Sequence, residues 1–154
     1  MEDIYEDFWG AFLEQTGRPE TTVMTDVTYF GDSEEESVTI LEQLLSGEKT
    51  AVGHCIPAYL ATKRRMPRAG DYTMVTDYYG NPCCILYTSD VTIAPMPEFP
   101  EDLRRMEYPE LTAEQWLARK QAESLDMASR LRFHYNEEIP LLMETVKMVY
   151  PQKD

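Results

Sequence analysis

The sequence predicts an α+β protein in which helices flank an antiparallel sheet or a small barrel. Apolar residues recur at helical spacing near the start of the chain and again in its last third. Between these stretches, short β-prone segments are separated by tight turns rather than by regular helices, which disfavours a doubly wound parallel sheet. The 154 residues suit one domain, and a hydrophobic content of 43% is sufficient for a real core.

Two helices are predicted before the first strand. Residues 2–16 carry their apolar side chains on one helical face, and Gly17 follows as a stop. Residues 34–46 begin after Ser33, whose hydroxyl can cap the helix, and three glutamates then suit the positive end of its dipole. Residues 18–33 are predicted to form a loop.

Five short segments are predicted as strands. They are residues 50–56, 72–77, 83–87, 91–94 and 144–150. The turn signal at Gly80 and Asn81 predicts an antiparallel hairpin between the second and third of them. Two further helices are expected at residues 101–106 and from residue 113 to about 135, and Pro140 is expected to break regular structure.

The net charge of −14 is unevenly distributed. Residues 1–48 carry thirteen acids and one base, whereas residues 49–72 carry five bases and one acid. A strongly acidic chain should repel a long polyanion, so no double-stranded DNA partner is expected, although a single phosphate or a short strand could bind the basic segment. Four of its five bases fall in a predicted loop, residues 57–68. Its candidate phosphate ligands are Lys63, Arg64, Arg65 and Arg68. The alternative interpretation is a solvated loop whose charge only aids solubility.

Composition argues against several classes of protein. Three cysteines without metal-ligand spacing predict neither a disulfide framework nor a zinc site, so no metal and no cofactor are expected. No apolar run is long enough to span a bilayer, and the acidic start of the chain is unlike a signal peptide. We therefore expect a cytoplasmic protein with no membrane partner. The common nucleotide, hydrolase and zinc-protease motifs are absent.

The segment LLSGEKTAV, residues 44–52, is the first candidate site. A glycine ends a helix there, and Lys49 and Thr50 begin a strand, where the lysine could hold an oxygen or act as a base if desolvated. The alternative is a helix-capping glycine followed by a lysine near the negative helix end, which requires no function. His54 is a further candidate, with a structural role equally open, whereas His134 is interpreted as a surface or packing residue.

An ordered series of short motifs resembles a known family. The motifs are Phe8-Trp9-x-x-Phe12, Phe30-Gly31-Asp32, Gly47-Glu48-Lys49-Thr50-Ala51, Pro67-x-x-Gly70-Asp71, Gly80-Asn81-Pro82 and the segment 144–150. Over about residues 5–150 they resemble the ASCH domain family, in its larger bacterial subgroup with an N-terminal helix. The resemblance implies a PUA-like antiparallel β-barrel of about five or six strands flanked by helices. It also implies a single domain over residues 1–154, with the N-terminal helix at 2–16 and the core at 34–150.

The resemblance also implies a site. In the family, a cleft beside the barrel is lined by the lysine and threonines of a G-x-K-T-x-T stretch and by acids from a later segment. Lys49 and Thr50 match the lysine and the first threonine, but the position of the second, nucleophilic threonine holds Val52, which has no nucleophilic oxygen. Glu107 and Glu110 lie in the segment that matches the acids. Whether this chain is an enzyme is therefore left open.

Three functions compete at this point. The first is binding of RNA or of a nucleotide-like ligand, for which the family is proposed, with Lys49 and residues 63–68 holding phosphate. Tyr59, Tyr78 or Tyr79 could then stack on a base, or could simply pack on an edge strand.

The second function is hydrolysis of a modified nucleoside such as N4-acetylcytidine, which some small family members are described as deacetylating. Lys49 would then orient or deprotonate a water, and Glu107 or Glu110 would move the proton. The third is a protein-interaction domain in which the apolar residues of the 116–135 helix contact a partner or a second copy, the alternative being that these residues face the core. The protein is expected to be a monomer or a homodimer.

Overall fold

The computed structural model describes residues 3–151, with Asp3 described by its backbone only. The contacts divide these residues into two compact units. Unit 1 comprises residues 3–48, 70–89 and 146–151, and unit 2 comprises residues 49–69 and 90–145. The prediction of a single domain stays a prediction.

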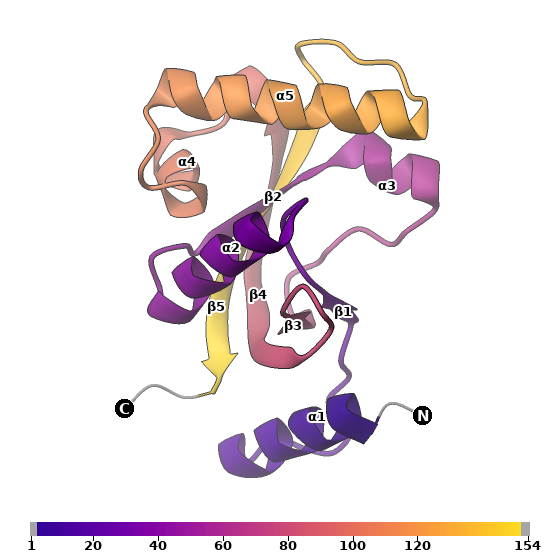
Figure 1. Cartoon of the computed structure of the whole chain (residues 1–154), viewed down its shortest axis with the longest axis vertical. Coiled ribbons are helices and arrows are strands. Elements are labelled where there is room, and N and C mark those ends of the chain that lie inside the picture. The colour runs from indigo at the N-terminus through magenta and orange to yellow at the C-terminus, as the bar shows by residue number, and fades with distance from the viewer. Residues whose placement is uncertain (1–2, 152–154) are drawn as a thin grey trace. The chain divides into compact units, whose positions relative to one another are not determined.

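The elements follow one another along the chain, and Figure 1 labels the α-helices and the strands. They are α1 (Asp3–Thr16), β1 (Asp26–Thr28), α2 (Glu34–Ser46), β2 (Ala51–Cys55), α3 (Ile56–Thr62), β3 (Tyr72–Thr76), β4 (Pro82–Pro95), the 3₁₀ helix η1 (Met96–Glu98), α4 (Glu101–Glu107), α5 (Ala113–Leu131) and β5 (Pro140–Tyr150). None of the helices in this part of the chain combines the length and the apolar character needed to cross a membrane.

The strands form a five-stranded sheet in the order β1-β3-β4-β5-β2. The predicted hairpin is present, because β3 and β4 pair in antiparallel fashion across the turn at Gly80. β2 and β5 are also antiparallel, whereas β1 runs parallel to β3. The long strands β4 and β5 each run from one unit into the other. The structure is therefore α+β, as predicted, and the five strands of the sheet fall within the predicted number of about five or six.

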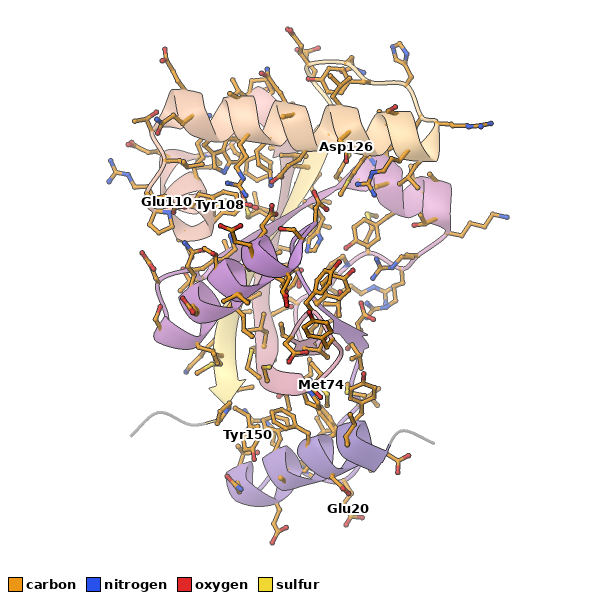
Figure 2. All side chains as sticks on the ribbon, viewed as in Figure 1. Glu20, Met74, Tyr108, Glu110, Asp126 and Tyr150 are labelled. Carbon is orange, nitrogen blue, oxygen red and sulfur yellow. The ribbon has the colours of Figure 1, made fainter. Side chains whose placement is uncertain are left out.

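Unit 1 is organised by the apolar face of α1. Phe12 is fully buried and packs with Ile85 of β4 and Tyr150 of β5, and Met74 of β3 is also buried. Met74 and Tyr150 can be followed in Figure 2. The guanidinium of Arg18 lies 5.0 Å from the centroid of the Phe12 ring and closes this core at the end of the helix.

Unit 2 is organised by α5, which begins with a capping box between Thr112 and Gln115. Its Trp116 is fully buried and belongs to a core that includes Ala51 of β2 and Met143 of β5. Within this unit α5 contacts α3, α4 and η1. Figure 1 shows α3 and α4 beside α5. This packing brings α4, α5 and the start of β2 together.

The structure corrects several local predictions. Residues 57–62, predicted as loop, and Ile56, predicted as the end of a strand, form α3. Pro57 is tolerated there because it occupies the first helical turn, where its missing N–H costs nothing. β1 lies in the predicted loop 18–33. Residues 82–95 form one strand rather than two, and Pro140 starts β5 instead of interrupting it.

Candidate functional site

A cluster of charged side chains is buried inside unit 2. Lys49, Glu107 and Lys120 are each at most 4% exposed, and we call these three residues with Trp116 the Glu107 cluster. Lys49 lies just before β2, Glu107 ends α4, and Lys120 lies on the same face of α5 as Trp116, one turn later. Buried charges are costly unless they are paired, so the partners of each group determine what the cluster can do.

The Glu107 carboxylate is held by three donors. Its Oε2 accepts from the backbone N–H of Gly53 at 2.6 Å and from Lys120 Nζ at 2.9 Å, and its Oε1 accepts from Trp116 Nε1 at 2.8 Å. Burial alone would raise the pKa of Glu107, but the charges of Lys120 and Lys49 and the hydrogen bonds outweigh it and hold the pKa below its ordinary value. Glu107 is therefore a fixed carboxylate anion inside the unit.

Lys49 reaches the same helix end. Its Nζ donates to the Glu107 backbone carbonyl at 2.5 Å and lies 3.9 Å from the centroid of the Tyr108 ring. Burial lowers the pKa of Lys49 to about 8, against the opposing attraction of the Glu107 carboxylate. Near that pH the amine is partly neutral and can accept a proton. The neighbouring Thr50 ties this segment to α4 through its backbone N–H, which donates to the Met106 carbonyl at 2.9 Å.

Tyr108 carries a second cation beside Lys49. The guanidinium of Arg119 lies 4.4 Å from the Tyr108 centroid, and the hydroxyl donates to Glu123 Oε2 at 3.3 Å. Burial raises the pKa of the Tyr108 phenol. Figure 2 shows Tyr108 and Glu110 together at the end of α4. Aromatic and cationic groups thus adjoin the Glu107 cluster.

His54 belongs to a separate polar group. Its Nε2 pairs with Glu144 Oε2 of β5, and its Nδ1 hydrogen-bonds the Tyr59 hydroxyl of α3 at 2.9 Å. Successive residues of a strand face opposite sides, and Gly53 is the residue of β2 that meets Glu107. His54 therefore faces away from the Glu107 cluster, and the structure does not join it to Lys49.

The structure brings together only part of the predicted site. Lys49, Thr50 and Glu107 converge, whereas Glu110 is exposed and Val52 is buried. The predicted phosphate ligands Lys63, Arg64, Arg65 and Arg68 are all exposed in unit 2, and the Arg64 guanidinium lies 5.4 Å from the Tyr59 centroid. Tyr79 belongs to unit 1, where its hydroxyl donates to Glu34.

Sequence reasoning missed Lys120 and Gly53. Trp116 and Lys120 are spaced i,i+4 and therefore lie on the same face of the helix. A lysine on the same face as a large apolar residue is expected to be buried and to need an acidic partner, and this spacing was the available signal for Lys120. Gly53 gave no local signal, because its role depends on a carboxylate 54 residues away. Among residues 3–151, no group of three or more His, Cys, Asp and Glu residues is arranged to hold a metal ion.

Known proteins share this fold. A family model described as the ASCH domain matches residues 26–150. The crystal structure of a protein from Enterococcus faecalis V583 matches with a TM-score of 0.86 at 25% identity, covering 97% of this chain and 92% of that one. An ASCH domain from Lactobacillus crispatus JV V101 matches with a TM-score of 0.86 at 24% identity, covering 97% and 96%. The comparison with curated proteins finds no match. The predicted PUA-like α+β fold class is confirmed.

Proposed function

The chain belongs to the ASCH domain family, and from that premise we propose that unit 2 binds short single-stranded RNA or a nucleotide-like anion. The observation that carries the proposal is the distribution of charge between the units. Unit 2 holds eleven of the fourteen Lys and Arg residues, and its residues 49–69 carry five bases and no acid. An anion is therefore attracted to this part of a chain whose total charge would otherwise repel it.

The exposed basic residues 63–68 are the proposed phosphate contacts. They follow α3, all four side chains are exposed, and Arg guanidinium groups match phosphate oxygens in a bidentate way. The number of cations limits the ligand to a few phosphates. A short strand fits this limit better than a duplex, whose phosphates would outnumber these cations.

Binding is tested with a fluorescently labelled single-stranded RNA of about ten nucleotides, followed by anisotropy at several salt concentrations. We expect log Kd to rise linearly with log salt, with a slope of about 0.7 for each phosphate neutralised. Lys63→Gln should reduce that slope and weaken binding. Lys147→Gln removes the same charge from an exposed position in unit 1 and serves as the matched control. Salt-independent binding, or equal effects of the two variants, would contradict the proposal.

Hydrolysis of an acylated nucleoside is the second candidate, favoured by the lowered pKa of Lys49, about 8. In this mechanism a water attacks the acyl carbonyl while the Lys49 amine takes a proton from it. The C–N bond then breaks as that proton is returned to the leaving nitrogen, which releases the carboxylic acid and the amine. Glu107, already bound by three donors, would position and tune Lys49, and the exposed Glu110 remains the candidate for moving protons.

This second candidate is tested with N4-acetylcytidine. Release of cytidine by the wild type and by Lys63→Gln, but not by Lys49→Ala, would establish it. Absence of turnover in the wild type would remove it and leave the binding proposal untouched.

The remaining expectations are less specific. Trp116 is fully buried and is not part of any surface of α5, whereas Leu125 and Leu131 are exposed there, so an interaction role for this helix rests on those two residues. The cytoplasmic location and the monomeric or homodimeric state stay predictions.

A further inference from the structure

Three tyrosines form an exposed aromatic surface on unit 1, and we call Tyr29, Tyr78 and Tyr79 the tyrosine cluster. Their exposed fractions are 46%, 39% and 73%. The Tyr29 and Tyr78 ring centroids lie 5.4 Å apart at 72°, and those of Tyr78 and Tyr79 lie 5.6 Å apart at 89°. Contiguous exposed aromatic rings are typical of an interaction surface.

Hydrogen bonds fix the position of the cluster. The Tyr79 hydroxyl donates to both carboxylate oxygens of Glu34 at the start of α2, at 2.5 and 2.9 Å. The Asp77 carboxylate accepts from the backbone N–H groups of Tyr79 and Asn81, each at 2.9 Å. The turn that carries Tyr78 and Tyr79 is therefore held in place before any partner arrives, which lowers the entropic cost of binding.

The negative charges around the tyrosine cluster favour the binding of a cation over that of an anion. Glu34 and Asp77 flank the rings, and hydrogen bonds from Asn81 lower the pKa of the Asp77 carboxyl, so it stays ionised. Residues 19–48 and 70–82, which carry the cluster, contain no Lys or Arg. The face of an aromatic ring is also negative, so carboxylates and rings together attract cations and repel phosphate.

We propose that the tyrosine cluster binds arginine or lysine side chains from a basic segment of a partner protein. The three rings contact one another edge to face and are open to solvent, so they do not enclose a free ammonium ion as a cage would. A partner segment can instead lay its cationic side chains on the rings while its backbone covers them. The acidic composition of unit 1, fourteen acids against two bases over residues 3–48, 70–89 and 146–151, supplies the long-range attraction.

The test uses a fluorescein-labelled peptide of about twelve residues that alternates arginine and glycine. A second peptide replaces each arginine with citrulline, which keeps the shape and the hydrogen-bonding groups but removes the charge. We expect the arginine peptide to bind the full-length protein, with an affinity that falls as salt rises, and the citrulline peptide not to bind. Equal binding of the two peptides would overturn the proposal.

Variants then locate the site. Tyr78→Leu and Tyr29→Leu keep apolar area but remove the ring, and each should weaken peptide binding about threefold. Glu34→Gln should weaken it more than Glu42→Gln, which removes the same charge from an exposed position on the same helix. Thermal melting identifies any variant that fails to fold, and the second tyrosine variant keeps the test usable in that case.

Other results would reassign the surface. Loss of RNA binding in Tyr78→Leu, with no binding of the arginine peptide, would make the cluster a base-stacking platform. Self-association of the protein alone that Tyr78→Leu abolishes would make a second copy the occupant. The inference is independent of the proposed function, since RNA binding depends on Lys63 in unit 2 and peptide binding on the tyrosines of unit 1.

Discussion

Gly53 leaves the space through which Glu107 reaches the backbone of β2. A Cβ atom at this position would lie 2.5 Å from Glu107 Oε2 and 3.0 Å from Lys120 Nζ. Moving either group would cost stability, because both are buried and paired with each other. We expect Gly53→Ala to lower the free energy of unfolding by on the order of 2–4 kcal/mol, measured by urea denaturation.

Gly10 provides the matched control for this substitution. It lies within α1, and a Cβ atom there meets nothing within 4 Å. Gly10→Ala should therefore raise the free energy of unfolding by about 0.5–1 kcal/mol, because alanine favours the helix over the unfolded chain. A Gly53→Ala protein as stable as the wild type would show that Glu107 does not approach β2 as described.

The direction in which the pKa of the Lys49 amine responds to its neighbours can be predicted. Its pKa of about 8 is the result of burial, which lowers it, and of the Glu107 carboxylate, which raises it. We expect an NMR titration of the lysine Nζ to give a midpoint near 8 in the wild type. Glu107→Gln should move the midpoint further down, since it removes the attraction but leaves the burial. An upward movement would contradict this account.

The same lowered pKa links Lys49 to stability. The unfolded chain holds the proton up to the ordinary pKa of 10.5, whereas the folded chain releases it near 8. Between these values the unfolded state binds more protons, so the contribution of Lys49 to stability is smallest below pH 8 and increases up to about pH 10.5. The free energy of unfolding of the wild type should therefore rise relative to that of Lys49→Met between about pH 8 and pH 10.5, and the difference between the two proteins should change little below pH 8.

The residues of the site were predicted where the signal was local. Lys49 and Thr50 stand out because a glycine-terminated helix precedes a strand, and Glu107 came only from the family resemblance. The sequence could not reveal that Glu107 is bound by three donors, because Gly53, Trp116 and Lys120 come from two other elements. The number of donors that bind a buried carboxylate depends on tertiary packing and not on spacing along the chain.

The helix caps allow a prediction for whole elements. Thr112 accepts a hydrogen bond from the Gln115 N–H at the start of α5, and Ser33 accepts one from the Glu36 N–H at the start of α2. Replacing either residue by alanine should cost about 1 kcal/mol of stability. Only Thr112→Ala should also change the NMR signal of the Lys49 amine, because α5 carries Lys120 into the Glu107 cluster.

Ser33→Ala is the control for this element, since α2 belongs to unit 1 and Lys49 to unit 2. A similar change of the Lys49 signal in both variants would indicate a general loss of stability instead of a specific effect of α5. Unfolding free energies measured on the same samples separate the two cases.

Elements with strong local signals were predicted well, and those without them were not. α2 begins and ends as predicted because Ser33 and Gly47 both act within one turn of the helix. α3 was missed because seven residues with a proline resemble a loop, and β1 was missed because its three residues gain their pairing only from β3. Pairing with a distant strand leaves no periodic pattern in so short a segment.

At the scale of the whole molecule, the two units differ in charge. Unit 1 carries fourteen acids and two bases over residues 3–48, 70–89 and 146–151, whereas unit 2 carries twelve acids and eleven bases. Repulsion among the acids of unit 1 opposes folding, and added salt screens it. The same salt weakens attraction between unit 2 and a phosphate ligand. Stability and RNA affinity should therefore respond to salt in opposite directions.

This opposition can be measured with two triple variants. The first neutralises exposed acids of unit 1, Glu6→Gln, Glu14→Gln and Glu20→Gln, and the second neutralises exposed acids of unit 2, Glu114→Gln, Glu137→Gln and Glu138→Gln. We expect the melting temperature of the wild type to rise between about 0.05 and 0.5 M sodium chloride, where the screening length falls several-fold. The first variant should lose most of this rise and the second should retain it. A melting temperature that falls with salt, or equal behaviour of the two variants, would show that the acids of unit 1 do not oppose folding.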